Sequence, residues 1–374
     1  MKLLLFFGRA VLNIIYFFHK AAPVKNQICL VSRQSDTPSL DIVMLEAELT
    51  RQSPETEIRV LCRMIGPGIK GKISYFFHMI TTQMHMFATS RVIVLDGYCI
   101  NACVLKHKKS LKIVQMWHAM GALKKFGWLS VDKNGGYPET IAKGMRMHKN
   151  YDVVFVGSEA CKPIMAPAFS CSEKIMEVMP LPRCDLILSK EYNEEIRAQI
   201  YEKFPQIKEK KVILYAPTFR KNADIKPYVE ELIEAVDYED YALIVKLHPL
   251  DKERIASNKA IIDSDFSSMQ WLSSADYVVT DYSAIVFEAA LAGKPIYRYA
   301  PDMERYSVCQ GLTDVFFEVP GPISKDTENV ICAIESEECD LGAVQAFADE
   351  YICADGKSSI AMAGCLLCIA GRKK

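Results

Sequence analysis

The chain has 374 residues, of which 50% are hydrophobic and 24% are charged, and its formal net charge at pH 7 is -1. These values are typical of a globular protein, and they exclude a disordered chain, a collagen-like chain and a coiled-coil rod. At about 100–200 residues per domain, the length predicts two domains with sizeable cores. Because the net charge is close to zero, we expect no nucleic-acid partner.

The N-terminal segment, residues 1–24, begins MKLLLFFGRAVLNIIYFFHK and mixes large apolar side chains with Lys2, Arg9 and Lys20. Its longest stretch between basic residues, Ala10–Phe18, is shorter than the ~20 residues that a membrane-spanning helix needs. A secretory signal does not fit, since Arg9 interrupts the run and no good cleavage site follows. We predict an amphipathic helix that lies in the membrane interface. A buried first helix of the domain is the alternative.

After residue 25, short runs of β-branched residues alternate with longer mixed segments. In the first half we expect strands at Gln27–Ser32, Glu57–Cys62, Arg91–Leu95, Lys112–Met116 and Asp152–Val156, and helices over Asp41–Arg51 and Ile73–Thr89. In the second half we expect strands at Lys211–Tyr215, Ala242–Leu247 and Tyr277–Thr280, and helices over Glu194–Phe204 and Ser283–Ala292.

Strands that alternate with helices predict parallel sheets with both faces covered. A break near Arg183–Tyr192 divides the pattern, so we expect two doubly wound, Rossmann-like α/β domains that face a cleft. The first would span residues 25–188 and the second residues 189–374, with a C-terminal helix that could pack back on the first domain. Ligands of such sheets bind at the carboxyl ends of the strands, and the unusual residues of this chain gather there.

A first group of reactive residues lies in the segment QMWHAMGALKKFG, residues 115–127. His118 directly follows an expected strand, where a histidine can act as a base near neutral pH. Lys124 and Lys125 come soon after it and can attract an anion. The alternative is a loop histidine with two solvated lysines.

Two further groups follow strands of the second domain. In YAPTFR, Thr218 offers a hydroxyl and Arg220 a planar fork suited to phosphate oxygens. The alternative there is a turn with a surface arginine. In VKLHP, Lys246 and His248 are two residues apart and would share one face of a strand, unless the histidine is structural.

A fourth group, residues 276–299, takes a buried strand into the start of a helix. Asp281 or Ser283 could be the N-cap of this helix. The same helix start, beside Thr280, could instead bind a phosphate or a ribose through free N–H groups. Glu288, on the second turn, could face the cleft.

Together, the histidines, arginine, lysines and helix start favour group transfer from a diphosphate-linked donor. In that reaction the leaving nucleotide phosphate needs positive charge and the acceptor hydroxyl needs a base. No Walker GxxxxGK[ST], strand-linked GxGxxG, HExxH or GxSxG motif supports another class. Thirteen scattered cysteines indicate reduced thiols rather than disulfides or zinc. No motif requires a metal, so we expect no cofactor.

Several short motifs occur in a fixed order along residues 27–356. They are Trp117-His118, Ser158-Glu159, Pro182-Arg183-Cys184-Asp185, Ala216-Pro217-Thr218-Phe219-Arg220, Lys246-Leu247-His248-Pro249 and Thr280-Asp281-Tyr282-Ser283. In this order the chain resembles the CDP-glycerol glycerophosphotransferase family, the teichoic-acid primases and polymerases of Gram-positive bacteria. The resemblance implies a GT-B-like fold at the cytoplasmic face of the cell membrane. It also implies transfer of glycerol phosphate from CDP-glycerol to a hydroxyl of a lipid-linked acceptor, a polyprenyl glycan or a polyol phosphate, with release of CMP.

The resemblance also implies roles for individual residues. His118 would be the catalytic base, and His248 would stabilise the pyrophosphate. Arg183 and Arg220 would hold the donor phosphates. Further positions of the matching motifs and strand ends are assigned to substrate binding: Trp117, Lys124, Ser158, Pro217, Thr218, Lys246, Thr280, Asp281, Ser283, Glu288 and Asp302.

Departures from the family pattern bear on the substrate. The loop after His118 reads Ala119-Met120-Gly121 where the family has Gly, Thr and Pro, and Ala284 lacks a hydroxyl that the family carries. These changes leave the polyol and the acceptor open, so CDP-ribitol could be the donor in place of CDP-glycerol. A GT-B glycosyltransferase or epimerase that uses a UDP-sugar would also fit the two-domain pattern, as would a non-catalytic membrane scaffold.

Overall fold

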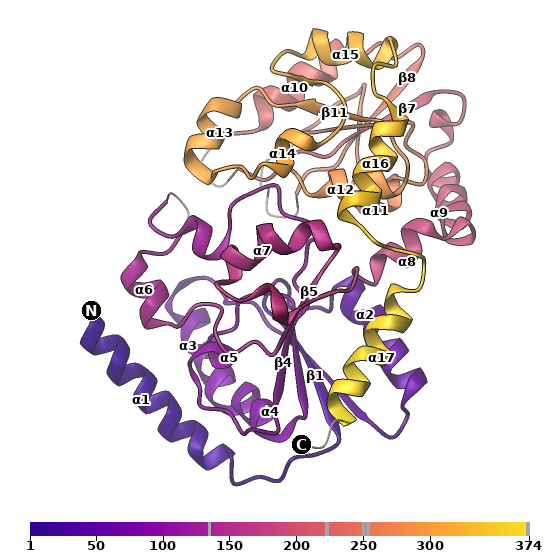
Figure 1. Ribbon diagram of the computed structural model, residues 1–374. Coiled ribbons are helices and arrows are strands. Elements are labelled where there is room, and N and C mark those ends of the chain that lie inside the picture. Colours follow the sequence, from indigo (N-terminus) through magenta and orange to yellow (C-terminus); the bar gives the residue numbers. More distant parts are fainter. Residues whose placement is uncertain (134–135, 221–223, 249–250, 252–254, 372–374) are drawn as a thin grey trace. The chain divides into compact units, whose positions relative to one another are not determined.

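A computed structural model describes residues 1–133, 136–220, 224–248, 251 and 255–371 (Figure 1). The chain divides into two compact units. Unit 1 comprises Met1–Ala119, Lys125–Asp185 and Lys357–Lys374, and unit 2 comprises Met120–Lys124 and Leu186–Gly356. The chain therefore passes between the units at 119/120, 124/125, 185/186 and 356/357. The domain boundaries drawn from the sequence stay a prediction.

Unit 1 contains a parallel six-stranded sheet with strand order β2-β1-β3-β4-β5-β6. Its strands are β1 (Gln27–Ser32), β2 (Glu57–Cys62), β3 (Val92–Leu95), β4 (Lys112–Gln115), β5 (Val153–Val156) and β6 (Met176–Val178). Leu95 of β3 pairs with both Val31 of β1 and Gln115 of β4, so these central strands end nearly level. The loops after β3 and β4 therefore start side by side at the carboxyl edge of the sheet.

The helices of unit 1 are interleaved with these strands. They are α1 (Lys2–His19), α2 (Leu40–Gln52), α3 (Gly68–His78), α4 (Met84–Thr89), α5 (Ile100–Val104), α6 (Glu139–Gly144), α7 (Lys162–Phe169) and α17 (Ser358–Gly371). The single helix expected over Ile73–Thr89 is divided by a π-helical turn, Met79–Gln83, that joins α3 to α4. In this turn the buried Gln83 accepts a hydrogen bond from the Asn101 side chain. Apolar spacing alone could not reveal such a polar contact.

The first helix, α1, lies along unit 1 and presents an apolar face outward. On its inner side, the buried Tyr16 donates to the Phe87 carbonyl and Asn13 donates to the Val104 carbonyl. The exposed large apolar side chains are Met1, Leu3, Leu4, Phe6, Phe7, Val11, Ile14, Phe17 and Phe18. The alternative of a buried first helix is therefore wrong. By length and composition α1 would also suffice to cross a membrane, because the helix continues through Arg9.

The last helix, α17, belongs to unit 1 although it follows the whole of unit 2 in the sequence. It packs along α2 (Figure 1). The amides of Ser358 and Ser359 donate to the two carboxylate oxygens of Asp185, which satisfies N–H groups that a helix start leaves open. Met362 and Leu366 are fully buried.

Unit 2 contains a second parallel six-stranded sheet with strand order β12-β11-β10-β7-β8-β9. Its strands are β7 (Lys211–Tyr215), β8 (Tyr241–Val245), β9 (Ile261–Ile262), β10 (Tyr277–Thr280), β11 (Ile296–Tyr299) and β12 (Ile323–Ser324). Its helices are α9 (Lys190–Lys203), α10 (Lys226–Ala235), α11 (Ser268–Trp271), α12 (Ile285–Leu291), α13 (Met303–Gln310), α14 (Val315–Glu318), α15 (Thr327–Glu335) and α16 (Leu341–Tyr351). The expected GT-B-like fold with two doubly wound parallel sheets is confirmed.

Some element ends differ from the sequence prediction. The segment of the expected break, Arg183–Tyr192, is mostly helical: α8 (Arg183–Leu188) is followed after Ser189 by α9. Strand β8 ends at Val245 rather than Leu247. Helix α12 begins at Ile285 with Ala284 as its N-cap and no side-chain cap. The expectation that Asp281 or Ser283 is the N-cap is wrong, because Ala284 holds that position. The Asp281 carboxylate instead accepts hydrogen bonds from the amides of Thr218 and Tyr282.

Candidate active site

The turn after β4 in unit 1 carries Trp117 and His118. Trp117 has a φ of 62°, a left-handed conformation that is costly for a bulky residue. Its amide donates to Oε1 of Gln115 at 2.9 Å. Its indole stacks on Phe126, with ring centroids 4.6 Å apart, and lies 4.3 Å from the His118 ring. The strained turn is therefore held by both its backbone and its side chain.

The hydrogen bonds of His118 define its protonation. Its Nδ1 lies 2.7 Å from the Asp96 carbonyl oxygen, in the loop after β3. Because a carbonyl only accepts, Nδ1 carries the proton and the neutral ring leaves Nε2 as an acceptor. Burial lowers the pKa of His118, and Arg183 lowers it further, against the opposing effects of the Asp96 carbonyl and Asp41. The ring is therefore neutral at pH 7 and able to accept a proton.

Arg183, at the start of α8, is paired within unit 1. Its Nε donates to the Asp41 carboxylate at 2.9 Å, and its own amide donates to the same carboxylate at 2.9 Å. Asp41 is 1% exposed. Nη2 of Arg183 also donates to the His118 carbonyl at 3.1 Å. The arginine therefore braces the His118 loop, and the phosphate-binding role expected for it stays a prediction.

Three further residues of unit 1 touch this site or lie close to it, and sequence reasoning missed them. Gln34 places its amide nitrogen 3.2 Å from Nδ1 of His118, a contact that is not a hydrogen bond when Nδ1 carries the proton. Gln115 bonds the Trp117 amide. Asp96 is 3% exposed, burial raises its pKa to about 6, and its Oδ1 lacks a hydrogen-bond partner among the described residues. All three follow or end strands of one sheet edge, which was the available signal. Ser158 is also buried there, with Oγ 3.6 Å from Cys161 Sγ.

In unit 2, Arg220 stands between two carboxylates. Its Nε donates to Asp302 at 2.9 Å, and its Nη2 lies 2.8 Å from Asp281. Its Nη1 donates to the Thr218 carbonyl at 2.6 Å. The side chain is 5% exposed. Burial opposes the charge, but Asp281 and Asp302 raise the pKa of Arg220. A donor phosphate would therefore compete with two carboxylates for this guanidinium.

Asp281 also joins the loops after β7 and β10. Asp281 accepts from the Thr218 amide at 2.9 Å and from the Tyr282 amide at 2.5 Å. Thr280 Oγ1 donates to the Ala216 carbonyl at 2.7 Å, next to the buried Pro217. These bonds brace the two strand ends against each other. Binding roles for Pro217, Thr218, Thr280, Asp281 and Asp302 stay predictions.

Lys124 and His248 are the two remaining basic candidates near this cluster. Burial lowers the pKa of Lys124 to about 8, Arg220 lowers it and Asp281 raises it. Its ammonium lies 5.8 Å from the centre of the Tyr306 ring. Burial and the nearby Lys124 lower the pKa of His248, against the effect of Asp251. At pH 7 Lys124 is mostly protonated, so it can attract a phosphate.

Close packing fixes the short segment that carries Lys124. A Cβ on Gly121 would overlap the Phe287 ring in α12, so only glycine fits there. The Leu123 carbonyl accepts from the Thr313 amide at 2.9 Å. The departure from the family pattern at Gly121 thus suits the packing of this segment.

Lys246 and His248 do not share one strand face, because β8 ends before both of them. Lys246 is buried and donates to the Asp263 carbonyl at 2.6 Å, whereas His248 is exposed and lies over Phe219, with ring centroids 5.6 Å apart. Trp271 also donates to Asp263, at 2.8 Å. The sequence expectation of a shared face is therefore wrong, although a substrate role for either residue stays a prediction.

The start of α12 contains the remaining assigned residues. Ser283 is half-buried, and its Oγ accepts from the Ile285 amide at 3.5 Å. Glu288 is buried within the helix. The described residues contain no group of three or more His, Cys, Asp or Glu that could hold a metal ion.

The chain is similar to known proteins along most of its length. A family model described as CDP-glycerol:poly(glycerophosphate) glycerophosphotransferase matches residues 14–363. The teichoic acid ribitol-phosphate primase of Bacillus spizizenii is 34% identical over 325 residues, 83% of each protein. The teichoic acid glycerol-phosphate primase of Bacillus subtilis is 32% identical over 291 residues, 75% of this chain and 74% of that protein.

A solved structure of the wall teichoic acid polymerase TagF, soaked with CDPG, has the same fold. Its TM-score is 0.73 at 17% identity, and the match covers 99% of this chain and 97% of that chain.

Proposed function

The chain belongs to the CDP-glycerol:poly(glycerophosphate) glycerophosphotransferase family, and we propose that it transfers a polyol phosphate from a CDP-polyol to a hydroxyl of a lipid-linked acceptor in teichoic-acid synthesis. The observation that carries the proposal is the bond from Nδ1 of His118 to the Asp96 carbonyl. This bond leaves Nε2 unprotonated in a ring whose pKa is lowered by burial. A neutral, oriented imidazole is the group that an acceptor hydroxyl needs as its base.

In the proposed reaction, Nε2 of His118 takes the proton of the acceptor hydroxyl. The hydroxyl oxygen forms a bond to the β-phosphorus of the CDP-polyol. The bond from that phosphorus to the bridging oxygen breaks, and its electron pair leaves with CMP. Lys124 and His248 of unit 2 would stabilise the negative charge of the phosphates, with Lys124 mostly protonated at neutral pH. No metal takes part in this scheme.

The donor that we propose first is CDP-glycerol, in keeping with the family. CDP-ribitol is the second candidate, because the ribitol-phosphate primase of Bacillus spizizenii is similar to this chain at 34% identity. The loop Ala119-Met120-Gly121, which departs from the family pattern, follows His118 directly. Substrate selection by this loop would account for a preference between the two polyols.

The test is the release of CMP from CDP-glycerol or CDP-ribitol, with UDP-glucose as the control donor and a lipid-linked acceptor preparation. We expect CMP from one CDP-polyol, only when acceptor is present, and no UDP from UDP-glucose. His85→Asn, a substitution of another half-buried histidine of unit 1, should keep the rate, whereas His118→Asn should not. Release of UDP with silence from both CDP-polyols would contradict the proposal and favour a glycosyltransferase.

We also propose that the protein works at the cytoplasmic face of the cell membrane, held there by α1. The inner side of α1 is hydrogen-bonded to unit 1 through Asn13 and Tyr16, so a position along the interface suits it better than one across the bilayer. Its exposed phenylalanines and leucines would enter the boundary between head groups and acyl chains, each contributing on the order of 1 kcal/mol or more.

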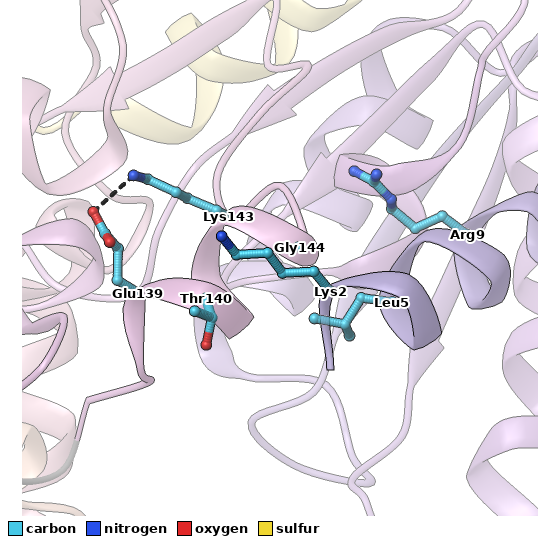
Figure 2. Close-up of a pocket in the computed structure, with 7 residues that line it drawn as sticks. All are labelled: Lys2, Leu5, Arg9, Glu139, Thr140, Lys143 and Gly144. Atoms are coloured by element: carbon cyan, nitrogen blue, oxygen red, sulfur yellow. Dashed lines mark ion pairs between the residues drawn. The ribbon is translucent and has the colours of Figure 1, made fainter.

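A basic hollow beside α1 supports this position. It has a volume of about 270 Å³ and lies between α1 and α6 (Figure 2). Lys2 and Arg9 line it from α1, and Lys143 lines it from α6, where Glu139 pairs with it at 2.8 Å. The excess positive charge suits the phosphates of anionic lipids.

The membrane position can be tested by vesicle flotation. The triple substitution Phe6→Ser, Phe7→Ser and Phe17→Ser removes exposed apolar area from α1 without touching its buried side. We expect at least a tenfold weaker binding to vesicles. Val308→Ser with Phe317→Ser, at exposed apolar positions of unit 2, should leave binding unchanged. Equal binding by the triple variant would assign the anchoring to another surface.

A further inference from the structure

Gln115 is the last residue of β4 and is completely buried, at 0% exposed. Its Oε1 accepts the Trp117 amide at 2.9 Å. Its Nε2 lies 3.0 Å from the Gly97 carbonyl and 3.1 Å from the Tyr151 hydroxyl oxygen. One side chain therefore joins the turn after β4 to the loop after β3 and to the segment that precedes β5.

These bonds hold the two backbone segments that position His118: the turn that carries it and the loop that carries its hydrogen-bond partner. Trp117, held by Oε1, is the residue directly before His118 and has the strained φ of 62°. Such a conformation is strained and persists only when the surroundings fix it. Gly97, held by Nε2, directly follows Asp96, whose carbonyl accepts the Nδ1 proton of His118. The backbone that carries the ring and the backbone that carries its partner thus share one buried amide.

A glutamine that served only the core would need partners, but they could lie anywhere around it. Here, two of its three polar contacts are with the segments that orient His118, and the third is with the Tyr151 hydroxyl. That hydroxyl oxygen also lies 2.9 Å from Nδ1 of the buried His148. Both segments end at the same edge of the sheet, where β3 and β4 finish level.

We propose that Gln115 is a positioning residue for His118: through Trp117 and Gly97 it fixes the direction of the imidazole ring and the nitrogen that carries the proton. The inference rests on the proposed role of His118 as the base. It concerns the orientation of that base and assigns Gln115 no contact with substrate.

The test compares Gln115→Met with Tyr151→Phe. The first substitution keeps the length of the side chain and removes both groups that hold the His118 segments. The second removes only the outer hydroxyl and leaves the Trp117 bond in place. We expect Gln115→Met to lower kcat by roughly 10–100-fold, because a misplacement of about 1 Å is that costly. The KM for the CDP-polyol should stay within about twofold, because the groups proposed to hold the donor phosphates belong to unit 2.

The pH profile separates positioning from general loss of structure. In the wild type, burial keeps the pKa of His118 low, so the acid limb of kcat/KM should lie below about pH 6.5. A loosened, better solvated ring has a higher pKa, so this limb should move to higher pH in Gln115→Met. Tyr151→Phe should keep the limb, with kcat within about threefold of the wild type.

An unchanged kcat and acid limb in Gln115→Met would overturn the inference, as would an equal loss and shift in Tyr151→Phe. A wild-type protein that releases no CMP from either CDP-polyol would instead contradict the proposed function. The two failures are therefore distinguishable within one set of assays.

Gln115→Glu tests the same inference if the methionine variant does not fold. When protonated, the introduced carboxyl can accept from Trp117 and donate to Gly97, but when ionised it cannot donate. The titratable groups that face it are Tyr151 and, behind it, His148, whose pKa burial lowers to about 3. Asp96 titrates in both the wild type and Gln115→Glu, so its effect cancels when kcat of the variant is divided by kcat of the wild type. We expect kcat relative to wild type to fall as the pH rises, and a constant ratio would overturn the inference.

Discussion

The two units hold their strand-end side chains in different ways. In unit 1, the imidazole ring of His118 is held by a neutral group, the Asp96 carbonyl, and keeps a nitrogen able to accept a proton. In unit 2, Arg220 is held by the carboxylates of Asp281 and Asp302, which use the charge that a phosphate would need. A neutral partner orients a group and leaves its reactive atom available, whereas an ionic partner uses the charge of the group in a salt bridge. The difference favours His118 as a reacting group and Arg220 as a brace.

The largest expected effect is on His118, whose ring is held by a neutral partner. His118→Asn should lower kcat by about 10²–10⁴-fold, because a positioned general base contributes that much. The KM for the CDP-polyol and the thermal midpoint should change little. Steady-state kinetics with a lipid-linked acceptor measures all three effects when combined with a melting curve. A variant with the wild-type rate would remove His118 from the mechanism.

For Arg220, which is held by ionic partners, we expect substitution to lower the stability of the protein. Arg220→Gln leaves two buried carboxylates without their partner, which should lower the free energy of unfolding by about 3–5 kcal/mol. Adding Asp302→Asn to this variant should restore part of the loss, because one uncompensated charge is removed. Urea unfolding measures both proteins. If Arg220→Gln kept its stability but raised the KM for the CDP-polyol, the phosphate-binding role predicted from the sequence would stand instead.

Lys124 sharpens the comparison, because burial lowers the pKa of this unit 2 cation to about 8. Lys124→Met should raise the KM for the CDP-polyol by about tenfold, since one cation near a phosphate is lost. The neighbouring Lys125→Met, a substitution in unit 1, serves as the matched control and should leave this KM within about twofold. Equal effects of the two substitutions would indicate a general charge effect rather than a site.

The smallest expected effect is a shift along the pH axis. The folded pKa of His118 is lowered, chiefly by burial, so the base form persists below the ordinary histidine pKa of about 6.5. Activity should therefore be retained down to a pH below about 6.5 and be lost as His118 becomes protonated at still lower pH. Lys124, whose pKa is about 8, should weaken donor binding as the pH rises through that value. An acid limb above pH 6.5 in kcat/KM would contradict the buried, neutral ring.

Much of the fold could be predicted from the sequence, because β-branched runs alternating with helical segments specify doubly wound sheets. The position of His118 after a strand was also predictable. The partners of Arg183 and Arg220 were not, because Asp41 is 142 residues from Arg183, and Asp302 is 82 residues from Arg220. An arginine that binds a phosphate and an arginine in a buried ion pair give the same sequence pattern, and only the folded structure distinguishes them.

The same limit explains the remaining differences. The strand expected to carry Lys246 and His248 ends early, and Lys246 turns inward to Asp263. Alternation of side chains holds only within a strand, so the shared face was lost with the two final residues. Gln115 and Asp96 escaped notice because a glutamine in a strand and an aspartate after one carry no motif. Their roles depend on the level ends of β3 and β4, which only the sheet register shows.

The position of α17 has a consequence for how the protein is made. During synthesis the residues of β1 to β6 leave the ribosome long before Ser358–Gly371, yet α17 packs in the same unit and its first amides bond Asp185. Unit 1 must therefore wait for the whole of unit 2 to be translated before its last helix can dock. Until then the surface beside α2 that α17 covers is open, so the nascent chain passes through an incomplete state that a chaperone can recognise.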